Sequence, residues 1–230
     1  MADNMMSSMD FNFELNQQLG DRFSDEGWSG ISPKFYKNDV PNIIKCIEIH
    51  KSYDKNGFTC MLSVYSNFKF PNAPKGKIMH TYTQIFLVGL SPTEVSNTSY
   101  DWLLTDDSKL NRQQFNLLWE TITSKGVDFF NRFNDFPEPF LHIKPADFEK
   151  GSVKLFDQYE VYSQIHFMNF LKEIHWSLGH EETAQTFSDL ALKQFHQNTQ
   201  GKPILLDKAY KKTIQEYIRF LEVPLKKVIK

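Results

Sequence analysis

The sequence is poor in cysteine: its 230 residues include only two, Cys46 and Cys60. Two cysteines do not make a disulfide framework, so we expect reduced thiols and a cytoplasmic protein. The chain also lacks a run of about 18 apolar residues, which a membrane-spanning helix requires. Its first residues do not combine a basic segment with an apolar one, so we expect neither a membrane anchor nor a signal peptide.

The chain also has no large excess of charge of one sign: it contains 26 basic and 28 acidic residues, and its net charge is −2. A general nucleic-acid-binding protein carries a basic footprint, which this chain does not have. The ten glycines are scattered and form no phosphate-binding loop, and no nucleophile elbow or Cys-x-x-Cys pair occurs. His175 and His180 are five residues apart across a predicted helix end, not four apart on one helix. We therefore expect no metal site and no cofactor.

Aromatic and apolar residues, by contrast, are abundant: apolar residues make up 40% of the chain, and phenylalanine alone occurs 21 times. A chain of this size can bury a large core filled by such side chains. Apolar residues at every fourth position from Phe11 to Phe23 predict an amphipathic helix that ends near Gly27. Residues 43–51 and 58–65 alternate and are rich in β-branched side chains, which predicts an antiparallel hairpin around the turn residues between them. A short strand pattern covers residues 32–38, and a longer one that is largely apolar toward its end covers residues 78–90.

The pattern changes to helical spacing from residue 107, where Ser108 or an aspartate beside it can cap a helix that should end or bend at Gly126. A proline-rich connector over 133–151 follows, and then three helical segments over residues 157–179, 180–197 and 207–222. We predict an α+β fold in which an antiparallel sheet of about four strands is flanked by helices. It would occupy residues 1–140, with a C-terminal helical hairpin subdomain over residues 152–230 packed on it.

The hairpin holds both cysteines, and its alternation separates them. Cys46, Glu48 and His50 share one face, while Cys60 lies on the apolar face of the second strand. Two thiols on opposite faces of a sheet do not form a disulfide. Residues four apart on a strand are about 13 Å apart, so Cys46 and His50 do not form a nucleophile–base pair. The face with Glu48 and His50 is the first place to expect a contact, and Tyr65 belongs to it.

The order of these segments resembles a bacterial family of uncharacterised domains, the domain of unknown function 4304. The resemblance covers about residues 9–140 and rests on "EGW" after the first helix, "KFYKN", the hairpin "IIKCIEIHKSYDKNGFTCMLSVY", "DWLL" and "GVDFFNRF". Members of the family typically have a tryptophan motif before the second long helix, where this chain has Trp102. The resemblance implies an α+β fold and no established activity.

Three hypotheses about function follow. The first, which we favour, is a non-catalytic cytoplasmic protein-binding module of bacteria, for example a toxin-neutralising or defence-associated protein with a protein partner. Its candidate binding residues are Glu48, His50, His80, Tyr65 and Trp102. The second is an enzyme, a hydrolase for instance, that uses the carboxylate and the two histidines of this set. The third is a helical adaptor that acts through residues 158–222.

Overall fold

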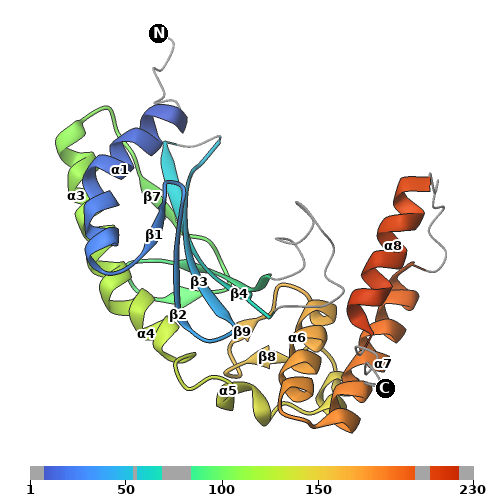
Figure 1. The fold of residues 1–230 in the computed structure, drawn as a ribbon. Coiled ribbons are helices and arrows are strands. Elements are labelled where there is room, and N and C mark those ends of the chain that lie inside the picture. Colours follow the sequence, from blue (N-terminus) through green and yellow to red (C-terminus); the bar gives the residue numbers. More distant parts are fainter. Residues whose placement is uncertain (1–7, 54–55, 69–83, 200–207, 223–230) are drawn as a thin grey trace, which may run out of the picture. The chain divides into compact units, whose positions relative to one another are not determined.

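The structure is a computed structural model that describes residues 8–53, 56–68, 84–199 and 208–222 (Figure 1). It divides into two compact units, one formed by residues 1–65 and 86–136 and the other by residues 66–85 and 137–230. The fold is α+β, as the sequence predicts. No helix in the described ranges is long and apolar enough to cross a membrane.

A mixed set of long and very short strands forms the sheet of the first unit. Its order is β1 (Ser29–Ile31), β2 (Lys34–Val40), β3 (Ile43–Lys51), β4 (Gly57–Ser66), β5 (Gln84–Leu90) and β6 (Val95–Ser96), with β7 (Asp101–Leu103) paired to β4. The seven strands that the described residues form in this sheet exceed the predicted four, because β1, β6 and β7 have only two or three residues each and leave no periodic signal. The predicted strand over 78–90 is present from Gln84, and its earlier part lies outside the described residues.

Helices α1 (Ser8–Asp25) and α3 (Ser108–Thr121) lie against one face of this sheet (Figure 1). The core between them is largely aromatic. The rings of Phe23 and Phe35 stack with centroids 3.8 Å apart, and Phe11 lies 5.5 Å from Phe58. The apolar positions at every fourth residue of α1 are buried, which confirms the predicted amphipathic helix.

Gly126 does not end the second long helix. The chain passes from α3 into a π-helix, η1 (Ile122–Gly126), and continues as α4 (Val127–Asn131). At the start of α3 the Asp107 side chain accepts hydrogen bonds from the Lys109 and Leu110 amides, so this helix begins where the sequence predicts.

The second unit is mostly helical. It contains α5 (Glu138–Leu141), the 3-10 helix η2 (Pro145–Lys150), the paired strands β8 (Lys154–Leu155) and β9 (Tyr159–Glu160), then α6 (Gln164–Ser177), α7 (Glu181–Thr199) and α8 (Lys208–Leu221). The prediction of a helix from about residue 157 is wrong, because β9 pairs with β8 and α6 begins only after Ser163, whose hydroxyl caps it. Helices α6 and α7 form the predicted hairpin. The predicted domain limits of 1–140 and 152–230 stay a prediction.

Candidate functional site

A buried carboxylate organises the polar face of the sheet. Glu48 lies on β3 opposite Lys34 of β2, and only 7% of its surface is exposed. Its Oε2 atom is 2.8 Å from the Lys34 ammonium and 3.2 Å from the His50 Nε2 atom. Its Oε1 atom accepts hydrogen bonds from the Tyr65 hydroxyl at 2.8 Å and the Ser63 hydroxyl at 3.1 Å. We call these five residues the Glu48 cluster.

These contacts confirm the predicted assignment of faces in the hairpin. Ser63 and Tyr65 of β4 reach Glu48 of β3, so the three side chains share one face. The Cys46 thiol also lies on this face, with its sulfur 3.9 Å from the Glu48 Oε1 atom. Cys46 and Cys60 are both buried and free, as the alternation predicts.

The electrostatics of the cluster favour a permanently charged carboxylate. Burial alone would raise the pKa of Glu48, but the hydrogen bonds from His50, Lys34 and Tyr65 outweigh it and lower the pKa to about 2. The pKa of Lys34 is raised, because its hydrogen bond and charge interaction with Glu48 exceed the effect of its own partial burial. Glu48 is therefore a counter-ion that holds its neighbours in place, and at neutral pH it has no proton to give.

The thiol and the phenol beside Glu48 stay protonated. Burial, reinforced by the negative charge of Glu48, raises the pKa of Cys46 well above its usual range. The same two causes raise the pKa of Tyr65. A protonated, buried thiol is a poor nucleophile, so Cys46 acts as a packed core residue on this face.

The Glu48 cluster reaches the surface through the side chains of Lys34 and His50. The side chains of Lys34 and His50 are 39% and 46% exposed, whereas that of Glu48 is 10% exposed. Their outward groups are an ammonium and an imidazole, both anchored from below by one carboxylate. Such an arrangement holds the hydrogen-bond donors of the Lys34 ammonium and the second ring nitrogen of His50 in fixed positions.

Of the other predicted residues, Trp102 is not part of this group. Trp102 is 1% exposed and lies in the core, where its ring stacks on Phe58 with centroids 6.0 Å apart. Its indole N–H donates to the Leu90 carbonyl at 3.2 Å, so its polar atom is used within the fold. His80 lies outside the described residues. Ser63 shares the predicted face of Tyr65 but was not among the candidate residues, and Lys34 was not predicted because only the strand register brings it opposite Glu48.

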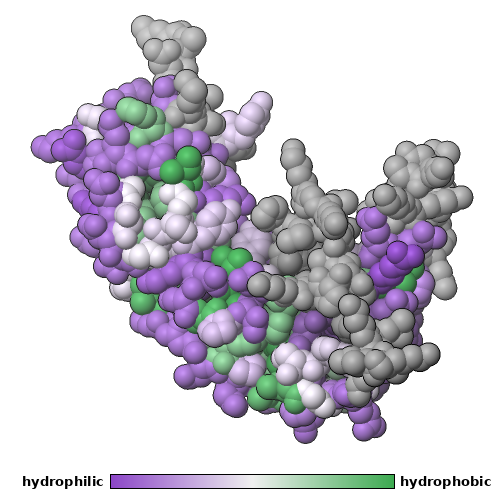
Figure 2. Space-filling view, viewed as in Figure 1, coloured by the Kyte–Doolittle hydropathy of each residue, from purple (hydrophilic) through white to green (hydrophobic). Residues whose placement is uncertain are grey.

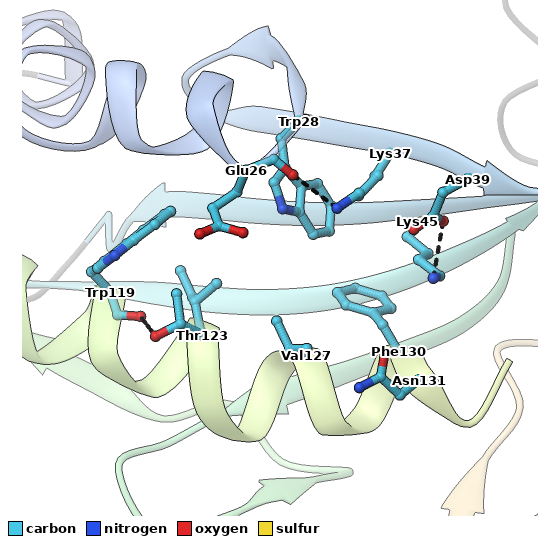
Figure 3. A pocket seen from close by; sticks show the side chains of 11 residues that line it. Glu26, Trp28, Lys37, Asp39, Lys45, Trp119, Thr123, Val127, Phe130 and Asn131 are labelled. Carbon is cyan, nitrogen blue, oxygen red and sulfur yellow. Dashed lines mark hydrogen bonds and ion pairs between the residues drawn. The ribbon is translucent and has the colours of Figure 1, made fainter. Parts of the chain in front are cut away.

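A second feature is a small pocket on the opposite, helix-covered face of the sheet (Figure 3). The empty space at this pocket, including the solvent at its open mouth, is about 490 Å³. Its lining comes from the end of α1, strands β2 and β3, and the helical stretch from α3 to α4, namely Glu26, Trp28, Lys37, Asp39, Lys45, Trp119, Ile122, Thr123, Val127, Phe130 and Asn131. The π-helix η1 forms part of its wall, and π-turns are frequent near functional sites.

Two lysines face each other across β2 and β3 in this pocket. Lys45 is 3% exposed, pairs with Asp39 at 2.9 Å and donates to the Asn134 side chain at 2.8 Å. Lys37 donates to the Glu26 carbonyl at 2.8 Å, and its ammonium lies 5.9 Å from the centre of the Trp28 ring. Lys37 and Lys45 lie directly opposite each other on neighbouring strands, where two positive charges repel. The contacts of each ammonium with other groups offset this repulsion.

Comparisons with known proteins give no further guide to the site. No protein-family model, no curated protein and no solved structure matches this chain. The resemblance to the domain of unknown function 4304 therefore stays a prediction.

Proposed function

We propose that this chain is a non-catalytic, cytoplasmic bacterial protein-binding module, for example a toxin-neutralising or defence-associated protein, and that the Glu48 cluster contributes to its contact surface. The observation that supports the proposal is the state of Glu48. A buried carboxylate with four partners and a pKa near 2 is built to hold neighbouring groups, not to exchange protons.

Fixed side chains favour binding. Lys34 and His50 are anchored to one carboxylate, so ordering them on association costs less conformational entropy than ordering free side chains. The Lys34 ammonium would best meet carboxylate or carbonyl oxygens of a partner, and the free ring nitrogen of a neutral His50 would accept a hydrogen bond from it. Figure 2 shows one side of the molecule, where hydrophilic residues predominate and hydrophobic ones form smaller patches.

Site-specific photo-crosslinking in the bacterial host tests the proposal. A photoreactive amino acid replaces His50 in one chain and Thr123, at the exposed rim of the pocket, in another. We expect one protein to crosslink through position 50 and not through position 123. The purified partner should then bind wild type, and His50→Ala should weaken the binding by about tenfold. Crosslinking through position 123 alone would place the contact at the pocket and refute the role of the cluster.

A hydrolase is the second candidate, because one observation favours it. The Glu48 carboxylate lies 3.2 Å from the Nε2 atom of a partly exposed histidine, as in pairs where a carboxylate orients a catalytic imidazole. If His50 were a general base, His50→Ala would lower hydrolysis of activated esters by about 100-fold or more. An equal, slow hydrolysis by wild type and His50→Ala would support the binding module instead.

A further inference from the structure

The turn between α6 and α7 is a Schellman motif with an unusual pair of residues at its ends. Gly179 has a φ of 78°, in the left-handed region that glycine adopts without strain. The His180 amide donates to the His175 carbonyl at 2.9 Å, and the Gly179 amide donates to the Trp176 carbonyl at 3.1 Å. This pair of hydrogen bonds defines the motif, and the residues at its two ends commonly make an apolar contact.

Here both end residues are histidines, and their rings meet. The Nδ1 atoms of His175 and His180 are 3.2 Å apart, with ring centroids 5.5 Å apart. Two nitrogen ligands at about 2.0–2.1 Å from one metal ion in tetrahedral geometry are about 3.3 Å from each other. The backbone motif therefore holds the two nitrogens at the spacing that one metal ion requires.

The surroundings make one ring fixed and the other accessible. His175 is 7% exposed and stacks on the Phe187 ring of α7 with centroids 5.6 Å apart. His180 is exposed, so an ion can enter from solvent. Among the residues that the structure describes, the Nε2 atom of His175 has no hydrogen-bond partner, so the contact with His180 is the polar contact that orients this ring.

We propose that His175 and His180 form a two-histidine site for a divalent first-row transition metal ion. Copper(II) should bind most tightly, followed by nickel(II) and zinc(II), in the order expected for imidazole ligands. No group of three or more metal-binding side chains occurs among the described residues, so water completes the coordination shell. A bound ion links the end of α6 to the start of α7.

Imidazole NMR of the untagged full chain with zinc(II) tests the site, because zinc is diamagnetic and the long-range nitrogen–proton spectrum reports each ring nitrogen. We expect the Nδ1 signals of His175 and His180 to shift together at one equivalent of zinc, while those of His196 stay in place. His196 is a suitable reference because it is exposed on α7 of the same unit. Shifts that appear first at His196 or at other histidines would overturn the proposal.

Nickel(II) titration calorimetry supplies a second measurement with a matched pair of variants. His180→Ala removes one of two ligands from an exposed position and should weaken binding by at least tenfold, whereas His196→Ala should leave it unchanged. The ion should also raise the melting temperature of wild type but not of His180→Ala, since it binds only the folded turn. Unchanged affinity in a folded His180→Ala chain refutes the site, whatever the outcome for the Glu48 cluster.

Discussion

Replacing Glu48 by glutamine removes the charge at the centre of the Glu48 cluster and keeps its shape. A fall in pKa from 4.5 in the unfolded chain to about 2 in the fold corresponds to about 3 kcal/mol of stability when the group is ionised. Lys34 loses its counter-ion in this variant, and the amide accepts the other hydrogen bonds less strongly. We expect Glu48→Gln to lower the free energy of unfolding by about 3 kcal/mol at neutral pH.

The stability difference between wild type and Glu48→Gln should depend on pH. Because the pKa of Glu48 is lower in the fold than in the unfolded chain, its stabilisation is complete above 4.5 and is lost as the pH falls toward about 2. A protonated glutamic acid resembles glutamine, so the difference between wild type and Glu48→Gln should shrink over the same range. The two proteins should approach equal stability at the acid end.

Urea unfolding followed by tryptophan fluorescence measures this difference. Trp28, Trp102 and Trp119 all belong to the first unit, so the signal reports mainly the unit that contains Glu48. Glu120→Gln, on the exposed side of α3, is the control and should change stability by less than about 0.5 kcal/mol. A loss below about 1 kcal/mol at neutral pH, or a loss that does not change with pH, would refute the reasoning.

Three other substitutions have expected outcomes in other parts of the chain. Gly89→Ala should lower the free energy of unfolding by about 2 kcal/mol or more in urea titrations, because the new methyl group would overlap the backbone carbonyl of Thr98. Burial lowers the pKa of His166 to about 4, so its ring is neutral in the fold. The stability of the second unit should therefore fall as the pH is lowered from 6.5 to 4, and His166→Phe should flatten that part of a plot of melting temperature against pH. Lys172→Met should cost about 3 kcal/mol or more and expose α8 to limited proteolysis, because the Lys172 ammonium pairs with Glu173 at 2.8 Å and donates to carbonyls at the end of α8. Equal proteolysis of wild type and Lys172→Met would contradict that role.

Local patterns predicted much of the candidate site. The alternation along the hairpin was enough to place Glu48 with His50 and Tyr65, and to separate Cys46 from Cys60, because side chains on a strand have a fixed period of two. The same rule predicted two free cysteines. The pattern did not predict that the polar face would be buried at Glu48, since burial depends on which strands lie on either side.

The turn at His175 and His180 shows what residue spacing alone misses. A separation of five residues does not match two ligands on one helix, so the spacing predicted no metal site there. The left-handed Gly179 folds the chain back, so the first and last residues of the turn come together. A glycine directly before the second histidine was the available signal, because it marks the end of a helix and the start of the Schellman geometry.

The sequence by itself determined the α+β class, the helix that begins after Asp107, the hairpin and the division of its faces, because each follows from periodicity or from a capping residue within a short segment. Tertiary structure alone decided the register that sets Lys34 opposite Glu48, the three short strands, the core position of Trp102 and the pairing of Lys172 with α8. These features depend on contacts between residues far apart in the chain, and a local pattern carries no information about which distant segment becomes the neighbour.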